Sequence, residues 1–499
     1  MSWVWSVIAL SVIATSGTES ARILAYFPTP SISHQIVFRH ITKELARRGH
    51  EVTVVTTDPM PTEQLPANMT EIDVHDVSYK HWEELFLIHK GNKQDVLNQM
   101  TKLFEKLATV INIQMETPNV RKVLRNKDKK YFDLLLLEAI CRPLIGLAHM
   151  FDAPIITISS FGAVPHQYEV FGAPMHPLIY PTPGSFRSYN LNFWEKGFEL
   201  IKYFTSEYMI SSTKDFDVMI MKKTFGNDVP TIEELAKRIQ MLFLNEHPIW
   251  AENHPIPPSM VFIGGIHQTD VKELPKVIIN LIRNRSIEIM TKVFSQLKYN
   301  ILWKWNNDDL PAVSNNTKIS RWFPQSDLLS KFFLYYLLFI TQGGLQSTDE
   351  TINAGVPVIG IPMLGDQWYN VEKYVHHKIG LQLELTTLTE KGFKDAIITV
   401  IEDKSYKNNI LKLRALMREF PIKPLDNAIW WIEHVIKHGG QHLQSPAARM
   451  SWAEYYEIKL VLIALAISLV ILVLLSYVLR FVLSIAYNIY ITNKKLKSF

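Results

Sequence analysis

The sequence predicts an α/β protein with two domains that face each other across a cleft, followed by one transmembrane helix. Three observations lead to this prediction. Strand-like and helix-like segments alternate along the chain, a proline-rich segment divides it near the middle, and an uncharged stretch of membrane-spanning length lies near the C-terminus. The 499 residues, 47% of them hydrophobic, suffice for two or three domains with substantial cores.

The composition excludes several classes of protein. The net charge is only +4, and no basic stripe with interleaved aromatic residues is present, so nucleic acid is not an expected partner. Because Cys141 is the only cysteine, the chain can form neither an internal disulfide nor a cysteine-based metal site.

A signal peptide is predicted over residues 1–20. Trp3 to Ala14 is a continuous run of apolar or small residues, and the small polar residues Thr15 to Gly17 follow it. This order matches the hydrophobic region and the cleavage zone of a secretory signal.

The first domain is predicted over residues 21–250. Arg22–Phe27 reads as a buried strand, apolar residues recur at helical spacing from Gln35 to Arg48, and Glu51–Thr57 reads as a second strand. Strand, helix and strand in this order form a βαβ unit with a right-handed crossover. Predicted strands at Asp133–Leu137 and Ile155–Ser159 extend the parallel sheet, and a helix is predicted at Val96–Ile111.

Residues 251–260, which include Asn253–Ser259 with its three prolines, are predicted to be a linker to a second α/β domain over residues 261–440. Ligands of such folds usually bind at the carboxyl ends of the strands, so a site is expected in the cleft between the domains. The expected strands of the second domain are Ile301–Trp305, Ile319–Phe323, Phe339–Thr341 and Val356–Ile361.

A membrane anchor is predicted at residues 460–479, after a juxtamembrane segment at 441–459. Leu460 to Leu479 carries no charge, and the basic residues of the tail at 480–499 place that tail in the cytosol. This predicts a type I protein whose body lies across the membrane, where sequons at Asn68, Asn284 and Asn315 would meet the glycosylation machinery. The last five residues fit an endoplasmic reticulum retrieval signal, and equally a basic stop-transfer cluster.

Residues 339–370 carry the most informative motif. A strand ends in Gln342, Gly343 and Gly344, and a helix follows from Leu345 to Gly355. The N–H groups of the first helical turn could hold a diphosphate, and the glycines would let it approach the backbone. A Gly-Gly turn alone is more often only a tight connection.

The whole stretch closely resembles the signature of the UDP-glycosyltransferase family, the membrane-bound enzymes that conjugate small lipophilic molecules. The resemblance extends to Trp322–Gln325, to the region of His34 and to the C-terminal tail. It implies a GT-B type fold with two Rossmann-like domains, and inverting transfer of a hexose from a UDP-sugar to a hydroxyl of a lipophilic acceptor, as in detoxification. UDP-glucose is the favoured donor. The acceptor pocket is expected in the first domain, around the aromatic and proline-rich residues 161–180.

The resemblance also implies roles for donor-binding residues. Trp322 would stack on uracil and Gln325 would bond the base or the ribose, while Glu350 would accept the ribose hydroxyls. Asp366 and Gln367 would hold the sugar. Without the surrounding motif, a lone Trp is usually core, a helical Glu is usually solvated, and an Asp is a common turn former.

Position 342 departs from the usual family pattern, in which it is histidine. Gln342 can still donate an N–H to phosphate but brings no positive charge, which would weaken stabilisation of the leaving group. Gln346 and Ser347, together with the backbone of Gly343 and Gly344, remain expected phosphate contacts.

The base is expected to be His34, in the loop after the first strand, because the family uses a histidine here and imidazole exchanges protons near neutral pH. Glu138, at the carboxyl end of its strand, would orient the ring, whereas Asp133 lies at the wrong end. A capping or surface histidine and a salt-bridged structural glutamate are the alternatives. Neither a metal nor a cofactor is expected beyond the UDP-sugar co-substrate.

Two further departures leave a second hypothesis open. Residues 268–291 lack the expected strand with its Ser/Gly loop, and residues 331–340 form an apolar run where relatives have a short His-Pro turn. A skipped exon boundary or a divergent copy would produce both departures. The second hypothesis is a catalytically impaired relative that binds lipophiles or pairs with active copies as a homo- or hetero-oligomer.

Overall fold

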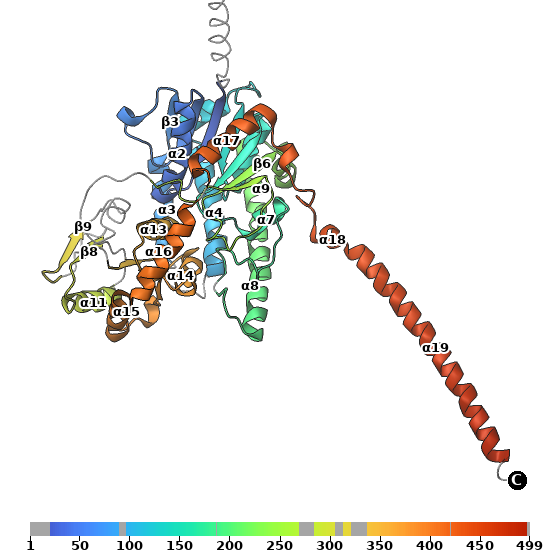
Figure 1. Cartoon of the computed structure of the whole chain (residues 1–499). Coiled ribbons are helices and arrows are strands. Elements are labelled where there is room, and N and C mark those ends of the chain that lie inside the picture. The colour runs from blue at the N-terminus through green and yellow to red at the C-terminus, as the bar shows by residue number, and fades with distance from the viewer. Residues whose placement is uncertain are drawn as a thin grey trace, which may run out of the picture.

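The computed structural model describes residues 20–88, 96–185, 187–268, 284–304, 313–320, 337–419 and 421–496. The chain forms a two-part α/β body from which one long helix extends (Figure 1). The α/β class with parallel sheets and an apolar C-terminal helix is the predicted one.

A seven-stranded sheet lies at the centre of the first half. All of its pairs are parallel, and its order is β3-β2-β1-β4-β5-β6-β7. The strands are β1 (Arg22–Phe27), β2 (Glu51–Thr56), β3 (Met69–Asp73), β4 (Leu134–Glu138), β5 (Ile155–Ser159), β6 (Ile239–Leu244) and β7 (Met260–Phe262). Because β1 and β4 are parallel neighbours, with Tyr26 opposite Leu137, the loops at their carboxyl ends meet.

Alternate residues of β1 enter two separate cores. Ile23 and Ala25 pack with α2 (Ile32–Arg47) and α17 (Pro424–His438), whereas Leu24 and Tyr26 pack with α4 (Val96–Met115) and α9 (Lys214–Phe225). This period of two places helices on both faces of the sheet, as expected for a doubly covered parallel sheet. The remaining helices of this half are α3 (His75–Ile88), α5 (Pro118–Leu124), α6 (Leu147–Met150), α7 (Pro165–Val170), α8 (Phe193–Ser212) and α10 (Ile232–Ala236).

The second half contains a parallel sheet in the order β10-β11-β12 and a separate β8-β9 pair. Its strands are β8 (Ile301–Lys304), β9 (Thr317–Ser320), β10 (Phe339–Thr341), β11 (Val358–Gly360) and β12 (Gly380–Gln382). Side chains from both groups, such as Trp303 and Ile340, share one core with Phe294 and Phe393. The helices are α11 (Asn284–Ser295), α13 (Leu345–Ala354), α14 (Gln367–His376), α15 (Glu390–Glu402) and α16 (Lys404–Arg418).

Two segments predicted to belong to the second domain lie in the first half instead. The first is strand β7, which pairs with β6 because its apolar residues continue the first sheet. The second is helix α17, whose apolar face packs against α2. After α17, Gln240 accepts a hydrogen bond from the N–H of Gly440, and Arg449 donates to the carbonyl of Ile239 at 3.1 Å. The chain therefore returns to the first half before it ends. We call the part built on the seven-stranded sheet, including α17, the first lobe, and the part built on the β10-β11-β12 sheet the second lobe.

The C-terminal helix α19 (Ile458–Leu496) follows the short α18 (Trp452–Tyr455). It is the one helix in the described ranges that is long and apolar enough to cross a membrane, and none of its most apolar stretch is buried. At 39 residues it measures roughly 58 Å, longer than the hydrocarbon core of about 30 Å. It begins before the predicted span at 460–479 and continues through most of the predicted tail. Residues 1–19 of the predicted signal peptide lie outside the described residues.

Candidate active site

His34 and Glu138 form a direct pair at the carboxyl ends of β1 and β4. His34 lies in the first turn of α2, and its Nδ1 is 2.7 Å from Oε1 of Glu138. The imidazole side chain is 18% exposed and the carboxylate only 1%. This contact commits Nδ1 to the carboxylate, so Nε2 is the ring nitrogen left for chemistry.

Glu138 is held by more than the imidazole. Its Oε2 accepts a hydrogen bond from the backbone N–H of Thr29 at 3.2 Å. The neighbouring Cys141 thiol is buried, and burial together with the charge of Glu138 raises its pKa well above the usual value. The carboxylate therefore faces a thiol that stays protonated, and its negative charge is directed at His34.

The predicted Gly-Gly turn connects β10 to α13. Gly343 has φ +90°, and a Cβ there would lie 2.3 Å from a methyl carbon of Val371, so only glycine fits. A Cβ on Gly344 would meet nothing within 4 Å. The backbone at Gly344 is therefore open to close approach by a ligand, at the N-terminal end of α13.

Asp366 lies beside this helix end. Burial raises the pKa of its carboxyl to about 6, while hydrogen bonds from Asn370 and the N–H of Leu345 and the charge of His34 act in the opposite direction. The carboxylate thus already satisfies one N–H of the α13 terminus, and it lies near the imidazole of the first lobe.

Asn370 joins these parts. Its Nδ2 donates to Oδ2 of Asp366 at 2.8 Å and to the carbonyl of Gly343 at 3.0 Å, while its Oδ1 accepts from Nε1 of Trp250 at 3.0 Å. This one amide therefore links Asp366, Gly343 and Trp250. Asn370 lies within the motif at residues 339–370, but the sequence predicts no role for it, because its side chain bonds to other groups of the protein.

The predicted polar side chains of the motif make contacts of their own. Gln367 accepts hydrogen bonds from the N–H groups of Met363 and Leu364, and its amide faces Oε1 of Gln342 at 3.4 Å. Gln346 donates to the carbonyl of Ser160 at 2.9 Å. One predicted phosphate contact therefore links α13 to the first lobe instead.

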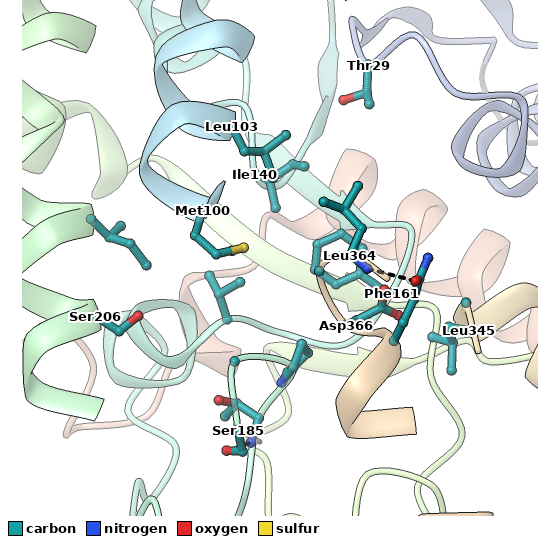
Figure 2. Close-up of a pocket in the computed structure, with 18 of the residues that line it drawn as sticks. Thr29, Met100, Leu103, Ile140, Phe161, Ser185, Ser206, Leu345, Leu364 and Asp366 are labelled. Atoms are coloured by element: carbon teal, nitrogen blue, oxygen red, sulfur yellow. Dashed lines mark hydrogen bonds between the residues drawn. The ribbon is translucent and has the colours of Figure 1, made fainter. Parts of the chain in front are cut away.

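A cavity of about 310 Å³ lies between the two lobes, and it brings five of the predicted site residues together (Figure 2). Figure 2 shows Leu345, Leu364 and Asp366 of the second lobe across the cavity from Met100 and Ile140 of the first. The predicted site residues that line it are His34, Gly344, Gln346, Asp366 and Gln367.

The other predicted residues lie elsewhere. Glu138 lies behind His34 and does not line this cavity, so it can act only by positioning the imidazole. The cavity is likewise not lined by Gln342, Gly343, Ser347 or Glu350, which belong to the turn and to α13. Trp322 and Gln325 lie outside the described residues, as do positions 269–283 and 331–336 of the two departures.

The apolar part of the cavity was only partly anticipated. Phe161, Val164 and Pro177 belong to the predicted acceptor segment. Trp82, Met100, Leu103, Tyr203, Ser206 and Ile210 of α3, α4 and α8 also line it, together with residues 182–185. On the sequence, their helical spacing is that of ordinary core residues, so no local signal distinguishes them.

A buried ammonium group secures the contact between the lobes. Lys373 of α14 is fully buried, donates a hydrogen bond to the carbonyl of Trp250, and lies 3.8 Å from Glu246 and 3.9 Å from Glu252. Burial lowers the pKa of Lys373 and raises that of Glu246, while the attraction between the two opposite charges acts against both shifts.

Metal-binding side chains gather at one place in the described part of the chain. Ligand atoms of His166, Glu169 and Glu207 lie within 4.8 Å of one another. None of the three lines the cavity of His34, and Glu169 already accepts a hydrogen bond from Tyr203 at 3.3 Å.

Comparison with known proteins shows the family of this chain. The family described as "UDP-glucoronosyl and UDP-glucosyl transferase" matches residues 23–495. An ecdysteroid UDP-glucosyltransferase of Spodoptera littoralis nuclear polyhedrosis virus is 32% identical over 93% of this chain and 97% of its own length. UDP-glucosyltransferase 2 of Dactylopius coccus is 31% identical over 90% of each chain.

Solved structures support the fold. The glycosyltransferase VinC in complex with dTDP has a TM-score of 0.57 at 13% identity, and it covers 84% of this chain and all of its own. The kitacinnamycin glycosyltransferase has a TM-score of 0.56 at 17% identity, over 83% of this chain. With the family match over nearly the whole length, the chain belongs to the UDP-glycosyltransferase family.

Proposed function

We propose that this protein transfers glucose from UDP-glucose to a hydroxyl group of a small lipophilic acceptor, with inversion at the anomeric carbon. The observation that carries the proposal is the shared cavity, in which His34 of one lobe faces Gly344, Asp366 and Gln367 of the other. The names of the viral and insect relatives, which describe UDP-glucosyltransferases, support glucose as the sugar.

In the proposed reaction, Nε2 of His34 takes the proton of the acceptor hydroxyl while its oxygen attacks the anomeric carbon. The bond from that carbon to the diphosphate oxygen breaks, and UDP leaves with the electron pair. Glu138 keeps Nδ1 protonated and stabilises the imidazolium that forms. The cavity contributes to the rate by holding both substrates in line.

The donor would lie against the second lobe. The open backbone at Gly344 and the dipole of α13 suit the diphosphate, while Asp366 and Gln367 suit the sugar hydroxyls. Trp322, Gln325 and Glu350 would hold uridine, with Gln342, Gly343 and Ser347 near the phosphates. The helix dipole and backbone N–H groups would carry the leaving-group charge, so we expect no metal requirement.

The proposed location is the endoplasmic reticulum membrane, with a cleaved signal peptide, α19 as a type I anchor and the body in the lumen. Asn68 and Asn315 of two sequons are exposed, as glycosylation requires. Detoxification by conjugation fits a lipophilic acceptor.

A direct test incubates membranes that contain the full chain with radiolabelled UDP-glucose and a panel of phenols and steroids. The wild type should transfer glucose, and His34→Ala should abolish transfer without changing UDP binding. The impaired-relative hypothesis makes the opposite prediction for the wild type, namely binding of lipophiles or pairing with active copies without transfer. Full activity in the His34→Ala variant would contradict the proposed base.

A further inference from the structure

Helix α8 carries a large exposed apolar face. Six side chains, which we call the α8 apolar face, are between 57% and 79% exposed: Phe193, Trp194, Phe198, Ile201, Phe204 and Tyr208. At about 100° per residue they fall within one arc of roughly 140°. Soluble proteins rarely expose so many large apolar side chains together, so this surface calls for an occupant.

The opposite side of the same helix lines the active-site cavity. Glu199, Tyr203, Ser206 and Ile210 contribute to the cavity wall. The helix is therefore the partition between the cavity and the exterior, with apolar groups on both of its sides.

The composition of the α8 apolar face suits a membrane interface. Aromatic residues dominate it, and Trp and Tyr are enriched where a bilayer meets water. Lys196 is exposed on one flank of the arc, where its charged end can reach lipid headgroups while its stem lies along apolar surface. Lys202, on the other flank, lines the active-site cavity and donates to Glu199 at 2.8 Å, so its ammonium is directed away from the arc.

The candidate membrane anchor begins near this helix. Tyr455 and Tyr456, directly before α19, line a small cavity together with Glu169, and Glu169 accepts a hydrogen bond from Tyr203 of α8. Figure 1 shows α8 at the edge of the body on the side where α18 and α19 leave it. A bilayer crossed by α19 would therefore lie on the side of the body that α8 occupies.

We propose that the α8 apolar face rests in the interfacial layer of the bilayer that α19 crosses, as a second membrane contact of the body. This contact places the partition helix between the lipid and the cavity. A second part of the proposal rests on the proposed function. The lipophilic acceptor dissolves in the membrane and enters the cavity from there, beside α8.

The test uses the fact that the single cysteine, Cys141, is buried. A new cysteine at Phe198→Cys in the full chain therefore takes an environment-sensitive fluorophore selectively. The matched control is Trp430→Cys, because Trp430 is 54% exposed on α17, which packs on the other face of the first sheet. Each labelled protein is reconstituted in phosphatidylcholine vesicles and exposed either to doxyl-labelled phosphatidylcholine or to aqueous iodide.

We expect doxyl lipid to quench the label at position 198 at least about threefold more strongly than the label at 430, and iodide to show the reverse order. Equal access of iodide to both labels, without quenching by doxyl lipid, would overturn the proposal. Energy transfer between copies labelled at 198, again without doxyl quenching, would overturn it in favour of a second copy on this face. Phe204→Cys gives the same comparison if the first variant is unstable.

This readout needs no substrate, so it is independent of glucosyl transfer. The acceptor route is tested separately with Phe198→Glu, which adds a charge to the face without touching the cavity. The KM for a lipophilic acceptor delivered in vesicles should rise about fivefold or more, while the KM for UDP-glucose stays unchanged. An unchanged acceptor KM would refute entry beside α8 and leave the transfer reaction intact.

Discussion

Replacing Glu138 by glutamine tests how the base is positioned, because the change keeps the size of the side chain and removes one acceptor oxygen. In the wild type, one carboxylate oxygen faces Nδ1 of His34 at 2.7 Å and the other faces the N–H of Thr29 at 3.2 Å. Both partners require an acceptor, and an amide offers only one.

Either orientation of the new amide is unfavourable. If its oxygen faces Thr29, its NH2 group faces Nδ1 of His34 and forces the proton onto Nε2, the nitrogen that has to accept one. If its oxygen faces His34, two donors meet at Thr29 with no acceptor between them. A wrong tautomer costs about 10⁴-fold in kcat in the Ser-His-Asp triad. We therefore expect a loss of about 10² to 10⁴-fold, or about 3 to 5 kcal/mol of barrier.

The assay is transfer of radiolabelled glucose at saturating acceptor, with UDP binding measured by calorimetry. UDP affinity should not change, because Glu138 does not line the cavity. Glu138→Asp keeps the charge and should recover part of the lost rate. Asp133→Asn, at the other end of the same strand, is the control and should retain wild-type kcat. If kcat of Glu138→Gln stays within about threefold of wild type, the positioning role is refuted.

Three further predictions concern the second lobe. Burial raises the pKa of Asp366 from 3.8 to about 6, so its carboxylate becomes protonated as pH falls through 6. The KM for UDP-glucose should therefore rise below that pH, whereas Asp366→Asn should show a high KM that does not change there. The raised pKa also means that charging Asp366 opposes folding, so wild-type stability should fall relative to Asp366→Asn as pH rises from about 4 to 6, as urea unfolding would show. Gly343→Ala should lose at least about 1 to 2 kcal/mol of stability and most UDP binding, since its Cβ would strike Val371 at φ +90°; wild-type melting and affinity would contradict this. Lys373→Met leaves Glu246 without its buried partner and should destabilise the protein by about 3 to 5 kcal/mol in urea unfolding. A change under 1 kcal/mol would refute the stabilising role of Lys373 between the lobes.

Much of the fold could be predicted because its segments carry strong local signals. The buried strand at Arg22–Phe27, the strand at Phe339–Thr341 and the helix that starts at Leu345 all lie where periodicity and glycine placed them. Strand β12 and the return of α17 to the first lobe were not anticipated, because pairing partners and long-range packing leave no mark on a local pattern.

The site was predictable to the extent that chain topology brings strand ends together. The sequence placed His34 and Glu138 at strand ends that face one cleft, and in the structure they meet because β1 and β4 are parallel neighbours. The sequence predicts no role for Asn370 or for the cavity-lining side chains of α8. On the sequence, a buried amide that positions other groups and a helix face that lines a cavity both look like ordinary core residues. The contact of Gln346 with Ser160 spans the two lobes and depends on how they dock.

The return of α17 has a mechanical consequence. The chain leaves the first sheet after β7 and returns to the first lobe at α17, so the second lobe is tethered to the first at both of its ends. Because Arg449 donates a hydrogen bond to the carbonyl of Ile239, the segment before α19 is held on the first lobe. If α19 crosses a bilayer as proposed, the first lobe would keep its orientation to that bilayer, and any opening of the cavity would move the second lobe.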